Sequence, residues 1–147
     1  MIEAFLKSAS ILGLGLLSGA TFYSSVVEIP VRQQMTDASQ QLLNWQFVFP
    51  KASGLLKPFG IALAPIILLT GYWSGQWIWY LAVGGLMLIV PFTSIWISKT
   101  NDELMGMTTL SPSEDIVVGI QSWDSRHNVR TVLCLSAFVS GVVASFF

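Results

Sequence analysis

Hydrophobic residues are concentrated in four long stretches, and polar residues fall mainly between them. The stretches cover about residues 5–27, 52–73, 77–98 and 129–147. Each is close to the roughly 20 apolar residues that a helix needs to cross a bilayer. Because backbone polar groups find no water inside lipid, these segments are expected to be helices. The pattern therefore predicts an all-α fold, an integral membrane four-helix bundle that forms one domain over residues 1–147.

The segments between the spans differ in length. Only "SGQ" separates the second and third spans, which predicts a tight antiparallel hairpin. The connections Pro30–Lys51 and Lys99–Arg126 are long, and an even number of crossings puts both on one side of the membrane. Thr36 is a candidate N-cap for a short amphipathic surface helix in the first connection.

The second long connection also contains a helix start. Ser111 is a candidate cap, and Pro112 stands at the first helical position. This helix either continues into the fourth span or breaks at Gly119.

Composition supports the membrane class. Charged residues make up 10% of the chain, whereas soluble domains carry about 25%. The net charge of −1 gives no reason to expect nucleic acid as a partner. A single cysteine and a single histidine exclude an internal disulfide and argue against a zinc cluster.

Basic residues are unevenly divided between the two sides. Lys7 alone falls on the side of the termini, and the other six fall on the side of the long connections. The positive-inside rule therefore predicts that both long connections are cytosolic and that the termini lie opposite, in the endoplasmic reticulum membrane if the cell is eukaryotic. The six residues are Arg32, Lys51, Lys57, Lys99, Arg126 and Arg130.

The first span carries a polar stripe. Ser18, Thr21, Ser25 and Glu28 follow at spacings of three, four and three residues, which places them on one helical face. One interpretation is close helix packing through small residues, supported by the Gly15-x-x-x-Gly19 pair. The other is a site in which the Glu28 carboxylate pairs with Arg130 or Arg32.

The third span ends in "PFTSIWISKTNDEL", in which Thr93, Thr100 and Asn101 share a face. Asn101 is either part of a site or a helix-terminating residue. Lys99 and Glu103, four residues apart, are expected to form a solvated ion pair.

The fourth span begins with "WDSRHNVR". Trp123, His127 and Arg130 lie on one helical face and offer an aromatic wall, a proton carrier and a permanent cation. Asp124 and Arg126 fit an anchoring role among the lipid headgroups. Because all three polar clusters occur at one membrane depth, and unpaired charge is costly in lipid, we expect them to share one cavity.

In this order, "GLGLLSGATFYSSVVEIP", "LLNWQFVFPKASG", "PFTSIWISKTNDEL" and "WDSRHNVRTVLCLSAFVSG" resemble the blocks of the anthrone oxygenase-like membrane family. Members of this family resemble small four-helix membrane proteins. Fungal members oxidise an anthrone to an anthraquinone with O₂ in aromatic polyketide pathways, and no flavin or haem motif is characteristic of them. Asn101, Trp123, His127 and Arg130 fall in the matching blocks.

The resemblance implies an oxygenase with molecular oxygen as co-substrate and no cofactor, acting on a hydrophobic small molecule. His127 would be the base, with Glu28 as a relay, and Arg130 and Asn101 would stabilise an enolate oxygen. Trp123, Thr93 and Ser25 would contact the substrate. A metal held by Glu28, His127 and a third ligand is also compatible with the sequence.

Two other functional classes fit the same residues. One is a membrane isomerase or cyclase that acts on another lipophilic biosynthetic intermediate. The other is a non-catalytic scaffold or partner subunit, single or oligomeric, whose polar residues only hold helices together.

Overall fold

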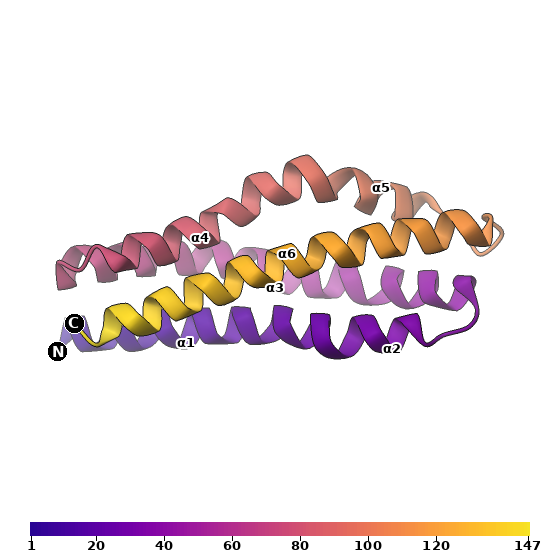
Figure 1. Cartoon of the computed structure of the whole chain (residues 1–147). Coiled ribbons are helices and arrows are strands. Elements are labelled where there is room, and N and C mark those ends of the chain that lie inside the picture. The colour runs from indigo at the N-terminus through magenta and orange to yellow at the C-terminus, as the bar shows by residue number, and fades with distance from the viewer.

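The computed structural model describes all residues from 1 to 147 and consists of four long rods joined by short turns (Figure 1). Two of the rods are single helices, and the other two contain a π-helical turn. All four are long and apolar enough to cross a membrane. In chain order the elements are α1 (Ile2–Tyr23), η1 (Ser24–Glu28), α2 (Ile29–Gln33), α3 (Ala38–Ser74), α4 (Ile78–Phe92), η2 (Thr93–Ile97), α5 (Ser98–Gly106) and α6 (Ser113–Ser145).

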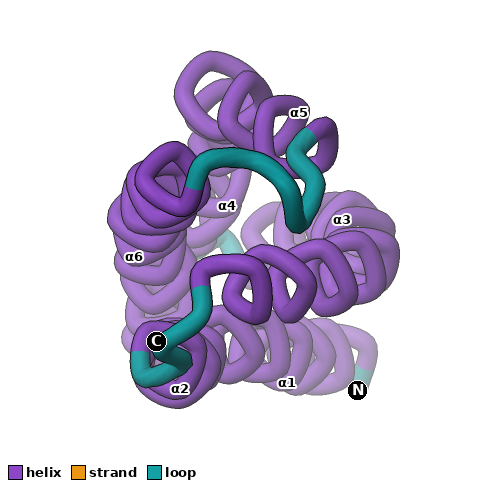
Figure 2. Tube along the Cα trace, turned by 90° about the vertical axis from the view of Figure 1, so that its right-hand side faces the viewer, coloured by secondary structure: helices purple, strands orange, loops and turns teal.

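The rods run antiparallel and form a bundle. Helix α6 packs against α1 and α4, and α3 packs against the same two helices from the other side. The end-on view shows the resulting four-sided arrangement (Figure 2). Both termini and the α3–α4 hairpin lie at one end, and the α2–α3 and α5–α6 connections lie at the other (Figure 1). The predicted integral membrane four-helix bundle is confirmed.

The connections are much shorter than the polarity pattern suggests. Most of the segments 30–51 and 99–126 are helical and extend the spans beyond their apolar parts. The bundle has two hydrophobic clusters, one nearer the termini and one at the end with the long connections. The extensions are helical because this second cluster buries their apolar residues, such as Leu42, Leu104, Ile116 and Ile120. The helix that starts after Pro112 runs through Gly119 without a break.

Two expected helix caps are wrong by a residue or more. Asp37, not Thr36, caps α3, and its carboxylate accepts a hydrogen bond from the Ser39 backbone N–H at 2.8 Å. Ser111 caps no helix, because its hydroxyl accepts from the Thr108 N–H within the turn. The tight hairpin is confirmed, with Gly75 in the left-handed region at φ 67°, where glycine has no steric penalty.

Helix packing in the apolar half depends on small and polar residues. The Ser10 and Thr70 hydroxyls are 2.7 Å apart across α1 and α3, and Ser18 donates to the Cys134 carbonyl on α6 at 3.2 Å. Of the glycine pair in α1, a Cβ added to Gly15 would lie 3.3 Å from the Phe138 ring, whereas one added to Gly19 would meet nothing within 4 Å. The packing interpretation therefore holds for Ser18 and Gly15.

Candidate active site

A cavity of about 590 Å³ lies inside the bundle and is lined by all four rods. It sits where two hydrophobic clusters meet. Leu17, Leu86 and Cys134 of its wall belong to the cluster nearer the termini, and Trp45 and Trp123 belong to the cluster at the other end. The volume falls within the range of small-molecule sites, roughly 300–1,000 Å³.

Both π-helical turns contribute to the cavity wall. Ser24 and Glu28 come from η1, and Thr93 and Ser94 come from η2. A π-helical turn inserts an extra residue, so it changes which side chains face inward and often marks a functional site. Around η2, the rod arches away from the bundle axis (Figure 1). The polar residues of the first and third rods thereby reach the cavity.

Trp123 is the centre of the polar part of the site. Its indole N–H donates to the Asn101 side-chain oxygen at 2.9 Å, which links α6 to α5. The His127 ring stacks on Trp123, with the ring centroids 4.9 Å apart and the planes at 16°. The guanidinium groups of Arg32 and Arg130 lie 5.6 and 5.9 Å from the Trp123 centroid. The ring of Trp123 therefore has an imidazole stacked on it and two cations nearby.

The hydrogen bonds of His127 define its tautomer. An Arg130 guanidinium nitrogen lies 2.6 Å from Nδ1, and the Thr21 carbonyl lies 3.3 Å from Nε2. Arginine can only donate, and a carbonyl can only accept. Nδ1 is therefore the acceptor and Nε2 carries the proton, so His127 is a neutral imidazole whose lone pair is covered by Arg130.

The expected partner of Glu28 is wrong. Arg32 pairs with Asp124 at 2.5 Å, and Gln33 donates to the other Asp124 oxygen at 3.0 Å. Glu28 instead accepts from the Ser24 hydroxyl at 2.6 Å. The cavity wall thus contains a carboxylate at Glu28 without a cation and a cation at Arg130 without a carboxylate.

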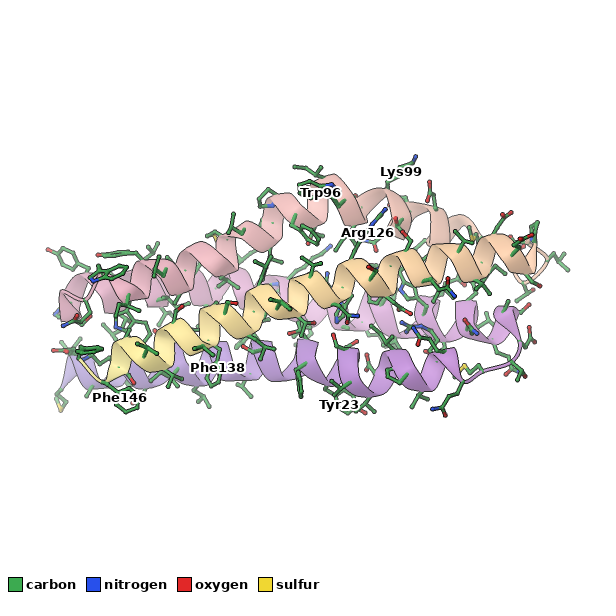
Figure 3. All side chains as sticks on the ribbon, viewed as in Figure 1. Tyr23, Trp96, Lys99, Arg126, Phe138 and Phe146 are labelled. Carbon is green, nitrogen blue, oxygen red and sulfur yellow. The ribbon has the colours of Figure 1, made fainter.

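The anchoring role expected for Asp124 is wrong, and Arg126 has partners within the protein. Asp124 is 3% exposed and belongs to the buried ion pair. Arg126 points from α6 toward the arched rod (Figure 3), where it donates to the Trp96 carbonyl and the Thr100 hydroxyl. It therefore ties the arch to α6. The solvated pair between Lys99 and Glu103 is present at 3.7 Å.

The structure brings most of the sequence-predicted site residues together. The cavity lining includes Glu28, Thr93, Asn101, Trp123, His127 and Arg130. Ser25 does not line the cavity, and its hydroxyl lies 2.8 Å from that of Thr131 on α6. No group of three or more His, Cys, Asp or Glu side chains is placed to hold a metal ion. The third ligand that Glu28 and His127 would need does not come from these residue types.

The sequence matches the profile of the anthrone oxygenase family over residues 45–140. The chain belongs to the anthrone oxygenase family. No curated protein and no solved structure matches it significantly.

The family match covers only part of the site. It runs from Trp45 in α3 to Ser140 in α6 and so includes Asn101, Trp123, His127 and Arg130. The first rod, with Thr21 and Glu28, lies outside the match. In this anthrone oxygenase family member, His127 therefore has one hydrogen-bond partner inside the matched region, Arg130, and one outside it, Thr21.

Several site residues escaped the sequence analysis. Arg32 was expected only as a basic residue near the membrane surface or a partner of Glu28, although it is 2% exposed and lines the cavity. Lys57 lines the cavity too, and a lysine within an apolar span was the available signal. Trp45 and Phe49, whose ring centroids lie 4.7 Å apart, belong to the first long connection, for which a short surface helix was expected. If the helix of the second span is extended toward its N-terminus, its periodicity puts Trp45 and Phe49 on the face that lines the cavity. This was the only signal for them in the sequence.

Proposed function

We propose that this protein catalyses the O₂-dependent oxidation of a hydrophobic aromatic polyketide, an anthrone, to the anthraquinone. The supporting observation is the Trp123–His127–Arg130 cluster on the wall of a large, mostly apolar cavity in a member of the anthrone oxygenase family. Such a cavity accepts a flat tricyclic molecule, and the cluster supplies a base and a cation at one point.

The reaction needs few catalytic groups. Loss of a proton from the anthrone methylene gives an electron-rich enolate. The enolate carbon is oxidised by O₂, which is reduced and, with a proton, becomes a carbon-bound hydroperoxide. Loss of water then gives the new carbonyl, so one oxygen atom enters the product and the other leaves as water. The protein must supply a base, an oxyanion partner and a dry site.

Arg130 and His127 are proposed to act in sequence. In the free protein, Arg130 covers the His127 lone pair at Nδ1. When a substrate carbonyl enters the cavity, the Arg130 guanidinium turns to that oxygen and Nδ1 becomes free to accept the methylene proton. Binding of the substrate therefore exposes the base, and the same cation then stabilises the enolate oxygen.

The other predicted residues have supporting roles in this proposal. Asn101 fixes Trp123 through its indole N–H and lines the cavity beside the enolate oxygen. Trp123 and Thr93 contact the substrate, and Glu28 relays the proton away from His127. Ser25 acts indirectly, because its contact with Thr131 holds η1 against α6.

We also propose that the end containing the α2–α3 and α5–α6 connections is cytosolic, in the endoplasmic reticulum if the cell is eukaryotic. Three of the seven cations, Arg32, Arg126 and Arg130, are held inside the protein by hydrogen bonds. Of the remainder, Lys51, Lys57 and Lys99 are on the same half as these connections, and Lys7 is on the other. The positive-inside rule still favours this orientation.

The decisive experiment is oxygen uptake by the purified protein with dithranol, a dihydroxyanthrone. We expect uptake above the rate of spontaneous oxidation in a heat-denatured control, and losses of about 10²–10⁴-fold in His127→Ala and about 10²–10³-fold in Arg130→Ala. Wild-type turnover in both folded variants would refute the assignment. Product formation without O₂ would instead favour the isomerase or cyclase class, which a base and a cation also suit. Elemental analysis of the same preparation tests for a metal.

A further inference from the structure

We propose that the cavity is filled sideways from the bilayer, through a gap between α3 and the α4–η2 segment. Its occupant is a lipid-dissolved, flat aromatic molecule. This inference rests on the proposed function for the identity of that molecule, but the access route is tested separately below.

The gap is identified by side chains that line the cavity and are also exposed on the outer surface of the bundle. Ile61 on α3 and Met87 and Val90 on α4 line the cavity, yet they are 70%, 41% and 56% exposed. All three lie within apolar membrane-spanning helices, so their exposed faces meet lipid hydrocarbon. No buried residue separates the cavity from lipid where these side chains stand. Lys57 and Ser94, also exposed, add a polar rim.

The arch of the third rod explains why the gap exists. Near the hairpin, α3 and α4 pack closely, and Gly71 lies against Trp79 and Tyr80. Beyond Phe92 the rod turns outward through η2 (Figure 1), and η2 packs against α6 rather than α3. Helix α3 continues straight toward its N-terminus, so the two rods separate at the level of Lys57 and Ile61.

The aqueous end of the bundle is closed. Between the cavity and the two connections lies the second hydrophobic cluster, whose members Leu42, Ile97, Leu104, Ile116 and Ile120 are at most 1% exposed. The buried Arg32–Asp124 pair crosses the same level. A molecule arriving from water would have to separate this cluster.

The other flank of α3 is less suitable. Val48 and Leu55 lie on the side of α3 that faces α1, and the opening there is bordered by Tyr23 and the Glu28 carboxylate. An apolar molecule that moves from lipid past an unpaired carboxylate loses favourable solvation without gaining a partner. The flank next to α4 presents the hydrocarbon of Ile61, Met87 and Val90, and its one cation, Lys57, is at the end of a long side chain that can extend toward the headgroups.

Cys134, the only cysteine, lines the cavity and is a native reporter of access. In liposomes, we expect N-phenylmaleimide, which dissolves in lipid, to label Cys134, and a charged methanethiosulfonate to label it at least tenfold more slowly. Val90→Trp and Ile61→Trp should slow N-phenylmaleimide labelling by fivefold or more. Leu88→Trp, which is lipid-facing but outside the cavity wall, is the matched control and should label like the wild type.

The outcomes separate the hypotheses. Faster labelling by the charged reagent, or no labelling by N-phenylmaleimide while denatured protein labels fully, overturns the lateral route. Slowing by Leu55→Trp but not by Val90→Trp moves the opening to the α1 flank and also overturns it. Far-ultraviolet circular dichroism and size-exclusion profiles identify misfolded variants, and Ile61→Ala, which should label faster, gives a test without added bulk. If labelling follows the prediction but dithranol is not oxidised, the route stands and the proposed function fails.

Discussion

The carboxylate of Asp124 and the guanidinium of Arg32 form an ion pair at 2.5 Å, with both side chains at most 5% exposed. This pair joins α2 to α6 across 92 positions of sequence. Neither charge has water as an alternative partner, so each depends on the other.

Removal of one partner should therefore be severe. Asp124→Ala leaves a buried guanidinium uncompensated, and we expect a loss of about 3–5 kcal/mol in the free energy of unfolding. The measurement is reversible unfolding in mixed micelles. The double variant Asp124→Leu with Arg32→Met should be more stable than Asp124→Ala, and a double variant as unstable as the single one would contradict the ion-pair explanation.

Asn101 should affect stability through the indole of Trp123. Asn101→Leu leaves the indole N–H without its acceptor, and we expect a cost of about 1–3 kcal/mol. Asn101→Asp keeps an acceptor oxygen at that place and should retain the environment of Trp123 in its near-ultraviolet circular dichroism signal. If Leu and Asp give the same signal, the hydrogen bond at 2.9 Å does not hold the ring.

A glycine in α4, Gly85, allows α4 and α6 to approach each other closely. A Cβ on Gly85 would lie 3.3 Å from the Ala137 Cβ, whereas one on Gly84 would have no neighbour within 4 Å. Gly85→Ile should cost about 1–3 kcal/mol through overpacking, with Gly84→Ile as the matched control in a thermal unfolding series. Equal melting temperatures for the two variants would argue against this packing.

The hydroxyl contact between Ser10 and Thr70 should matter less. Interhelical hydrogen bonds in membranes contribute about 0.6 kcal/mol on average, so Ser10→Ala should lower unfolding free energy by roughly that amount. Activity should remain, because both residues lie outside the cavity wall. A loss of several kcal/mol would mean that this contact, rather than apolar packing, holds α1 to α3.

Hydrophobicity predicted the four spans because lipid leaves few alternatives for a long apolar segment. It could not predict the extensions, since residues such as Leu42 and Ile120 become apolar core only after the rods have assembled. Helical spacing correctly grouped Trp123, His127 and Arg130, which are neighbours on one face. The partner of Arg32 could not be read in the same way, because the choice between Glu28 and Asp124 depends on how two rods pack.

The two π-helical turns could not be predicted from the sequence either. Nothing in the residue types of 24–28 or 93–97 separates them from ordinary helix, apart from nearby Pro30 and Pro91. A proline removes one backbone donor, so a neighbouring turn can widen at lower cost. Residue types and helical spacing therefore identified part of the site, and the register of these two turns contributed to which residues meet.

Helix α3 contains three prolines and lines the cavity mainly with apolar side chains, the exceptions being Ser53, Lys57 and the indole N–H of Trp45. The proposed base and cation come from α6, and the proposed amide comes from α5. The width of the cavity and its proposed reacting groups thus depend on different helices. A relative could accept a broader or narrower ring system through substitutions on one helix, with the reacting groups untouched. Libraries of variants confined to positions 48–61 are accordingly the direct route to changed substrate preference.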